Sequence, residues 1–312
     1  MSHHVVVLGA GAMGSLFGGL IAEGGLDVTL VDPWQEHIDS IREHGLKMVG
    51  YGGDRHISLQ ATTDPASIES ADLVFVQCKA NFNAVAAESV RHLFAAGGDT
   101  VAISFQNGLG NEEQLAEYFG KDRVLGGLTA QGASIESPGV VRNHAELPSY
   151  IGEMSGGLSD RARTIADVLT GANLPTEPSE NIRLDIWRKL MANIAISAVS
   201  GITGLNIGDI FNDHFGDDVS YAALDEAITV AKAVGIDLSP DDAREILGKI
   251  SGPNGTPQNK SSLRVDIENE RPSEIDYING AVVKLAKAHN VAVPVNEALV
   301  TLVHAIQSQY LR

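Results

Sequence analysis

The chain opens on a glycine-rich turn between a short apolar segment and a segment with helical periodicity. Residues 5–8 read Val-Val-Val-Leu, and Gly9, Gly11 and Gly14 follow at once in GxGxxG spacing. After a buried strand, this spacing allows a tight turn, a close approach of backbone to a pyrophosphate, and close packing of the helix on the strand. The residues expected to contact the pyrophosphate are Gly9, Gly11, Ala12, Met13 and Gly14. The alternative is a turn in another kind of α/β protein.

A second apolar segment supports the dinucleotide interpretation. Residues 27–31 end in Asp32, about twenty residues after the glycine turn, where a carboxylate holds a ribose 2′-hydroxyl. The same carboxylate would face the 2′-phosphate of NADP at short range, which is unfavourable. The next basic side chain, Arg42, lies a helix away. Asp32 therefore favours NAD, with NADP as the alternative; a helix-capping role for Asp32 is compatible with this one.

Size and charge limit the classes of partner. The chain has 312 residues, 44% of them hydrophobic, which is enough for two folded domains. Its 40 acidic and 22 basic residues give a net charge of −18, so nucleic acid and anionic membranes are unfavourable partners. No apolar stretch is long enough for a membrane span, and because the first strand begins within a few residues of the start we expect no signal peptide. With Cys78 as the single cysteine, we expect a cytoplasmic protein.

The periodicity of the chain changes along its length. Over residues 1–178, predicted strands alternate with helices, which indicates an α/β domain with a parallel, doubly wound sheet. Within it we expect a hairpin at residues 45–59 and an antiparallel extension of the sheet formed by strands at residues 123–133, 139–142 and 149–152. Residues 179–312 show only helical periodicity, which predicts an all-helical second domain. Its apolar faces could make a homodimer, although the sequence does not determine the oligomeric state.

Two polar residues follow predicted strands of the first domain. Lys79 comes after the apolar run at residues 73–77, and Asn107 follows the next strand. Ligands bind at the carboxyl ends of the strands in open α/β sheets. Both side chains are therefore candidates for contact with cofactor or substrate, although a common Asn-Gly turn and an exposed lysine would equally explain them.

A helical segment in the second domain carries three polar residues on one face. Lys189, Asn193 and Ser197 are spaced i, i+4 and i+8 among mostly apolar residues. A buried ammonium needs a polar partner. A bound carbonyl acid would supply one; the alternative is a structural carboxylate such as Asp185 or Glu274. The ten histidines show no ligand spacing, so no catalytic metal is expected.

Taken together, these residues resemble the ketopantoate reductase family. The resemblance rests on order and spacing over nearly the whole chain. Its motifs are the glycine loop, Lys79, Gln106-Asn107-Gly108, Trp187-Arg-Lys189 with Asn193, Ser261-Ser262, Glu274-Ile-Asp-Tyr-Ile-Asn-Gly280 and Ala292-Val-Pro-Val-Asn296. It implies an N-terminal Rossmann domain, a helical C-terminal domain and an active site in the cleft between them. The implied reaction is hydride transfer from NAD(P) to the keto carbon of a 2-oxo acid such as 2-dehydropantoate.

The resemblance also implies residue roles. Lys189 would be the general acid that protonates the developing alkoxide. Asn193, Ser197 and Ser262 would bind the hydroxyl and carboxylate of the substrate. The remaining candidates are Lys79 and Asn107, against the cofactor and the reacting centre, and Glu274, which would meet the cofactor's ribose or orient the lysine.

Three positions depart from the family pattern. Ser197 replaces a common second asparagine, and Asp32 stands where NADP-using members carry a small or basic residue. Arg264 replaces an apolar residue and could clamp a carboxylate bidentately. The lysine is kept, which favours the same chemistry on a different 2-oxo acid, as in NAD-linked 2-hydroxy-acid dehydrogenases. A dinucleotide-sensing regulator without turnover is the competing interpretation.

Overall fold

The computed structural model describes residues 3–95, 98–212 and 216–311. The chain forms two compact units. The first comprises Met1–Gln106 with Asn111–Arg183, and the second comprises Asn107–Gly110 with Leu184–Arg312. The short turn after Gln106 therefore groups with the second unit although it is embedded in the sequence of the first.

The first unit is built on an eight-stranded sheet in the order β12-β11-β8-β7-β6-β1-β2-β5. Its strands are β1 His4–Leu8, β2 Asp27–Val31, β5 Gln60–Thr62, β6 Leu73–Val76, β7 Val101–Ser104, β8 Val124–Thr129, β11 Ser149–Glu153 and β12 Thr176–Pro178. All neighbouring pairs are parallel except β8 with β11. Central strands such as β1 and β6 are continuous apolar runs because both faces of a parallel sheet are buried.

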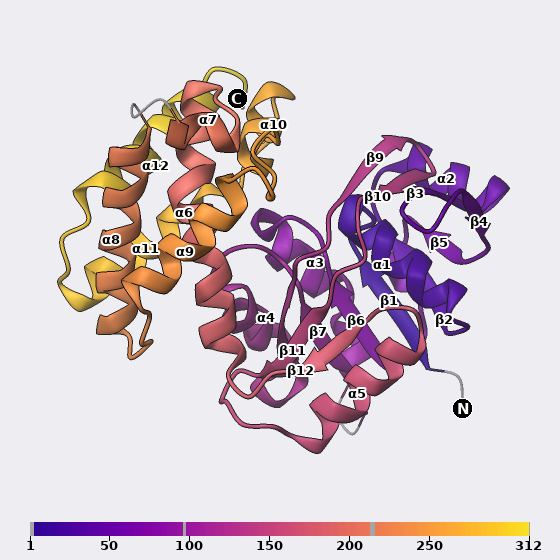
Figure 1. Cartoon of the computed structure of the whole chain (residues 1–312). Coiled ribbons are helices and arrows are strands. Elements are labelled where there is room, and N and C mark those ends of the chain that lie inside the picture. Colours follow the sequence, from indigo (N-terminus) through magenta and orange to yellow (C-terminus); the bar gives the residue numbers. More distant parts are fainter. Residues whose placement is uncertain (1–2, 96–97, 213–215, 312) are drawn as a thin grey trace. The chain divides into compact units, whose positions relative to one another are not determined.

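Helices cover both faces of this sheet (Figure 1). On one face, α1 (Ala12–Glu23), α2 (Gln35–His44) and α5 (Asp160–Gly171) share an apolar cluster with alternate residues of β1 and β2. On the other face, α3 (Asn83–Ser89) and α4 (Asn111–Phe119) pack against the intervening residues. The unit also contains 3-10 helices, η1 Pro65–Ser67, η2 Ala80–Phe82, η3 Arg91–Phe94 and η4 Lys121–Arg123. The predicted doubly wound Rossmann architecture is confirmed.

A second, four-stranded sheet has the order β4-β3-β10-β9. Its strands are β3 Leu46–Gly50, β4 Arg55–Ile57, β9 Ala133–Ser137 and β10 Val140–Asn143. The predicted hairpin, β3 with β4, is present. The predicted antiparallel extension of the main sheet is confirmed for β11, which pairs antiparallel with β8. It is wrong for β9 and β10, because β10 pairs in parallel with β3 and antiparallel with β9 in this second sheet. Val141 and Met48 share an apolar cluster with Leu16 of α1, so this small sheet covers the helix.

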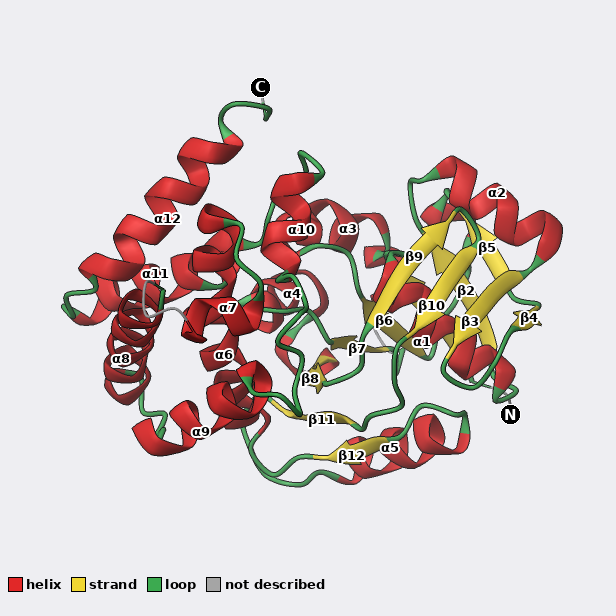
Figure 2. Ribbon diagram, turned by 45° about the horizontal axis from the view of Figure 1, so that its top comes forward, coloured by secondary structure: helices red, strands yellow, loops and turns green. Residues whose placement is uncertain are grey.

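The described residues of the second unit form helices joined by loops, with no strand among them (Figure 2). Its elements are α6 Ile182–Thr203, α7 Ile207–Asn212, α8 Asp217–Ala233, α9 Pro240–Ser251, α10 Ser262–Glu268, η5 Ile275–Tyr277, α11 Asn279–His289 and α12 Pro294–Gln307. Apolar side chains from several faces of α6 are buried in one cluster with residues of α8, α11 and α12. An apolar pattern around most of a helix indicates a central position in a bundle. The predicted all-helical character is confirmed for residues 184–212 and 216–311.

None of the helices in the described part of the chain combines the length and apolar character needed to cross a membrane.

Candidate active site

The glycine loop passes directly over the turn that follows β6. Gly9 has φ +103°, and a Cβ at this position would lie 2.6 Å from Cys78 Cα and overlap the backbone nitrogen of Cys78. Its own N–H donates to Val31 O over 2.8 Å. Only glycine has no steric cost at this positive φ and leaves room for the neighbouring backbone. The structure therefore requires glycine at position 9 for the loop itself.

Gly11 and Gly14 differ in what surrounds them. A Cβ on Gly14 would overlap the carbonyl oxygen of Gly9 and approach Val7 Cγ1 at 3.2 Å, so α1 packs closely on the loop and on β1. Gly11 is the N-cap of α1 with φ −65°, and a Cβ there would meet nothing within 4 Å beyond its own chain neighbours. The space at Gly11 is therefore not needed by the protein, which fits a group bound from outside at this helix N-terminus.

Asp32 is tied to the glycine loop. Its Oδ2 accepts a hydrogen bond from the Ala10 N–H at 2.8 Å, and its Oδ1 accepts from the Trp34 N–H at 2.9 Å. Each carboxylate oxygen has further acceptor capacity. Asp32 therefore lies beside the loop with an acceptor pair suited to ribose hydroxyls, and its cap-like bond to Trp34 is compatible with that use.

A buried histidine, which was not predicted from the sequence, supports the same loop. His37 Nδ1 accepts from the Gly139 N–H at 3.0 Å, while Nε2 lies 3.1 Å from Ser15 Oγ, which itself donates to Ala10 O at 2.8 Å. Since Nδ1 is an acceptor, the ring proton is on Nε2 and is donated to Ser15. Burial lowers the pKa of His37, which favours this neutral form. Nothing in the local spacing signalled this role, because Gly139 is distant in sequence.

Lys79 lies at the predicted edge of the main sheet. It directly precedes η2, and its carbonyl accepts from the Phe82 N–H at 2.8 Å. The preceding residue, Cys78, is the one packed against Gly9. The structure therefore brings the Lys79 turn and the glycine loop together within the first unit.

In the second unit, Lys189 and Asn107 meet directly. Lys189 Nζ donates to Asn107 Oδ1 at 3.1 Å. The Asn107–Gly110 turn is held against η5, since the Leu109 N–H donates to Tyr277 O at 2.8 Å. Gly108, at φ +95°, is packed so closely that a Cβ would overlap the same carbonyl. Two residues far apart in sequence thus form one polar pair.

The environment of Lys189 alters its acidity. Burial lowers the pKa of Lys189 from its ordinary 10.5 to about 8, and the negative charge of Glu274 partly opposes this shift. Asp185, the other carboxylate considered as a partner, forms an ion pair with Arg188 at 3.4 Å. An ammonium with a pKa near neutrality can give up its proton readily, which a general acid requires.

The remaining substrate candidates lie on α6 and α10. Asn193 and Ser197 follow Lys189 at one-turn intervals on α6, and Ser197 is buried. The N-cap of α10, Ser261, donates to Ser197 O at 3.4 Å, so the start of α10 lies beside this face. Ser262 is the exposed first residue of α10.

Arg264 already has partners within the protein. Its Nε donates to Glu268 Oε1 at 2.7 Å, and Nη1 donates to Asn206 Oδ1 at 2.8 Å. A bidentate clamp on a substrate carboxylate would have to compete with Glu268. The structure thus gives Arg264 a structural explanation that the sequence did not suggest.

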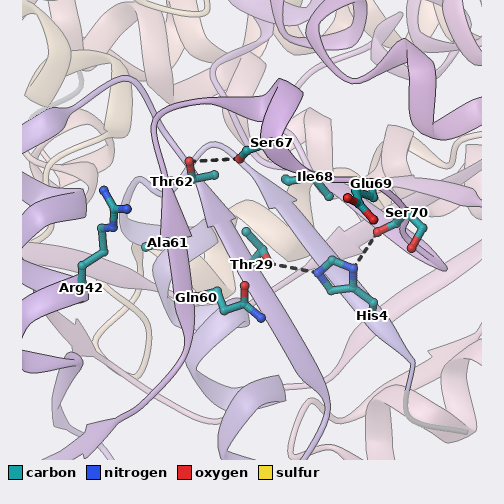
Figure 3. Close-up of a pocket in the computed structure, with 10 residues that line it drawn as sticks. All are labelled: His4, Thr29, Arg42, Gln60, Ala61, Thr62, Ser67, Ile68, Glu69 and Ser70. Carbon is teal, nitrogen blue, oxygen red and sulfur yellow. Dashed lines mark hydrogen bonds between the residues drawn. The ribbon is translucent and has the colours of Figure 1, made fainter.

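A cavity of about 360 Å³ lies in the first unit (Figure 3). Its lining residues are His4, Thr29, Arg42, Gln60, Ala61, Thr62, Ser67, Ile68, Glu69 and Ser70. His4 is the first residue of β1, whereas the glycine loop follows its last residue. Both ring nitrogens of His4 are used internally, at 2.7 Å from Ser70 O and 3.0 Å from Thr29 Oγ1. The cavity contains none of the residues predicted for cofactor or substrate.

Over the described residues, no group of three or more His, Cys, Asp or Glu side chains is placed to share a metal ion.

Comparisons with known proteins agree over nearly the whole chain. A 2-dehydropantoate 2-reductase from Halobacterium salinarum is 33% identical over 97% of this chain and 98% of its own, and one from Pyrococcus abyssi is 35% identical over 94% of each. A D-mandelate dehydrogenase solved with NADH and anilino(oxo)acetate is 27% identical, with a TM-score of 0.93 over 99% of both chains. A ketopantoate reductase structure from Ralstonia eutropha is 28% identical, with a TM-score of 0.91 over 99% of this chain and 100% of its own.

Two family models cover most of the sequence. The model described as ketopantoate reductase PanE/ApbA matches residues 5–156, and its C-terminal counterpart matches residues 181–307. Together with the full-length relatives, these matches confirm the resemblance carried by the glycine loop and the lysine helix. The chain belongs to the ketopantoate reductase family of oxidoreductases.

Proposed function

We propose that this protein is an NAD-dependent oxidoreductase that interconverts a 2-oxo acid and its 2-hydroxy acid, with Lys189 as the proton donor. The observation that carries the proposal is the Lys189–Asn107 pair, in which a partly buried ammonium of lowered pKa is held by an amide oxygen. Such a group is suited to an oxygen that gains negative charge during reduction. The physiological setting we propose is a reducing cytoplasm.

The first unit fits a dinucleotide. The N-terminus of α1, with Gly9, Gly11, Ala12, Met13 and Gly14, would hold the pyrophosphate through backbone N–H groups. Support comes from the space at Gly11, which no protein atom fills. Lys79, in the adjacent turn, and Asp32 would contact the remainder of the cofactor. When bound, the nicotinamide would supply a hydride to the keto carbon.

We propose NAD rather than NADP because of Asp32. Its carboxylate is fixed beside the loop by Ala10 and Trp34, and a 2′-phosphate placed there would be repelled. The D-mandelate dehydrogenase that resembles this chain was solved with NADH.

Lys189 performs the proton transfer in this proposal. In its charged form it donates a proton to the substrate oxygen, and in the reverse direction its neutral amine accepts that proton. Asn107 orients the amine through its side-chain oxygen. Glu274 stabilises the charged form, so that the lysine still holds its proton near neutral pH.

We assign substrate binding to the polar face that continues from Lys189. Asn193 and Ser197 would hydrogen-bond the hydroxyl and carboxylate of the acid, with Ser262 at the start of α10. Arg264 would assist through charge, although Glu268 and Asn206 already occupy part of its guanidinium. The substrate would be 2-dehydropantoate or a related 2-oxo acid.

A cofactor and substrate panel tests this function. The purified protein is mixed with NADH or NADPH and a series of 2-oxo acids that includes 2-dehydropantoate, and absorbance at the nicotinamide band is followed. We expect oxidation of NADH by at least one 2-oxo acid. Robust oxidation of NADPH with none of NADH would overturn the cofactor assignment, and a protein that binds NADH without turnover on any acid would instead indicate a sensing function.

The pH profile should report Lys189. Because the acid form is required for reduction and the pKa is about 8, kcat/KM for reduction should be level below that pH and fall about tenfold per pH unit above it. The reverse oxidation needs the neutral amine, so its kcat/KM should rise up to about the same pH and then level off. If reduction and oxidation did not show these opposite pH dependences, Lys189 would not be the proton donor.

A further inference from the structure

A cluster of buried polar side chains, which the proposed chemistry does not use, is hydrogen-bonded to the turn that contains Cys78 and Lys79. It consists of Asn83, Ser104, Gln106, Asn111 and Glu112, and each is at most 8% exposed. All five belong to the first unit: Ser104 is the last residue of β7, and the others come from the segments that follow β6 and β7. Buried polar groups are costly unless they are hydrogen-bonded, so such a cluster needs a reason.

Gln106 is the centre of this cluster. Its Nε2 donates to Cys78 O and to Asn83 Oδ1, both at 2.6 Å, and its Oε1 accepts from Ser104 Oγ at 3.2 Å. Asn83 in turn donates from Nδ2 to Asn111 Oδ1 at 2.9 Å. The amide protons of Gln106 are both used, which fixes the orientation of its side chain.

Glu112 completes the chain of donors. Glu112 is 3% exposed, and its carboxyl is hydrogen-bonded to Ser104. Burial raises the pKa of this carboxyl to about 8, while hydrogen bonds to its own backbone and to Ser104 oppose the rise. The raised pKa favours the protonated form, which can donate to Ser104 Oγ. Because the single Ser104 proton goes to Gln106, the donors run in one direction, from Glu112 through Ser104 and Gln106 to Cys78 O.

This series of hydrogen bonds ends at Cys78, in the turn that packs against the glycine loop. Gln106 binds the carbonyl of Cys78, and the nitrogen and Cα of the same residue are the atoms that leave no room for a Cβ on Gly9. A shift of the Cys78 backbone would therefore displace either the loop or Lys79, the next residue. Leucine in place of Gln106 would remove the donor that Gln106 supplies to that carbonyl.

We propose that Gln106, oriented by Ser104 and Glu112, is a positioning residue that sets the Cys78–Lys79 turn and thereby the glycine loop for dinucleotide binding. Its effect on cofactor affinity rests on the function proposed above. Its effect on the conformation of the turn does not depend on that function, and the two effects can be measured separately.

Cys78 provides the reporter, because it is the only cysteine in the chain and is partly exposed. The rate at which Cys78 reacts with a thiol reagent, in the absence of cofactor, reports the conformation of the Cys78–Lys79 turn. A calorimetric titration with NADH reports the ability of the glycine loop to bind the cofactor. For Gln106→Leu we expect the thiol reaction to change by about tenfold and the Kd for NADH to rise by about tenfold, with kcat at saturating NADH within about threefold of wild type.

Matched variants separate positioning from a general loss of structure. Glu112→Gln keeps a neutral donor to Ser104 and should behave as wild type in both measurements. Glu112→Leu removes this donor, so its thiol reaction rate and its Kd for NADH should change in the same direction as those of Gln106→Leu. Glu113→Gln, at an exposed neighbour, is the charge control. If Gln106→Leu does not fold, Ser104→Ala tests the proposal in its place. For this variant we expect a change of about threefold in the thiol reaction rate and in the Kd for NADH.

The outcomes are distinct. A folded Gln106→Leu protein, or Ser104→Ala in its place, with wild-type thiol reactivity and wild-type NADH affinity would overturn the positioning role. Altered thiol reactivity with unchanged NADH affinity would also overturn it. If wild type itself binds no NADH while the thiol reactivity still changes, the proposed function fails and the role of Gln106 in the turn stands.

Discussion

Lys189→Met should lower kcat for reduction of the 2-oxo acid by about 10²–10⁴-fold, the usual contribution of a positioned general acid. Methionine keeps the apolar stem of the lysine and removes the ammonium, so packing in α6 should be preserved. The glycine loop and Asp32, which we propose hold the pyrophosphate and ribose, lie in the first unit, and the Kd for NADH should therefore stay within about threefold of wild type. Stopped-flow kinetics and an NADH titration measure the two quantities.

The control for this variant is Lys287→Met, which removes the same charge from an exposed position on α11. It should leave kcat unchanged. If Lys189→Met retained wild-type kcat, proton donation by this lysine would be wrong. A loss of NADH binding equal to the loss of kcat would instead show that Lys189 acts through cofactor binding.

Gly9→Ala should have the second large effect, on folding and on cofactor binding together. The positive φ and the overlap with the Cys78 backbone cannot be relieved by a side-chain rotation. Strain of this kind and overpacking each cost about 1–3 kcal/mol, so the free energy of unfolding should fall by about 2–6 kcal/mol. Denaturant unfolding followed by circular dichroism measures this, and NADH affinity should fall at the same time.

Gly11→Ala is the matched comparison. Its backbone is ordinary and its surroundings are open, so stability should change by no more than about 0.5 kcal/mol. NADH affinity should nevertheless fall by about tenfold or more, because a methyl group would occupy the space expected for the pyrophosphate. Equal and small effects of both substitutions on NADH affinity would show that the loop does not hold the cofactor.

Much of the fold could be predicted from local patterns. The apolar strands β1, β2 and β6 and the glycine turn predicted the doubly wound sheet, since both periodicity and spacing were contained in short segments. The helical spacing after residue 182 predicted the second unit in the same way. The polar face of α6 followed from the four-residue spacing of Lys189, Asn193 and Ser197.

What could not be predicted depends on long-range contacts. β9 and β10 join β3 and cover α1, a pairing set by tertiary packing of Val141 and Met48 that no local pattern specifies. The Asn107–Gly110 turn groups with the helical unit because Leu109 bonds to Tyr277. The Glu268 partner of Arg264 was readable as an i, i+4 pair, and weighing it would have shown a structural role for this arginine.

The proposed reaction is tested most directly by following the hydride from the nicotinamide to the product. The protein is incubated with a 2-oxo acid and NADH carrying deuterium at both C4 positions of the nicotinamide, and the product is analysed by mass spectrometry and NMR. Hydride transfer with Lys189 as proton donor predicts a 2-hydroxy acid with deuterium on C2, formed by wild type and far more slowly by Lys189→Met. Failure to form a 2-hydroxy acid from any 2-oxo acid, or a product without deuterium at C2, would contradict it.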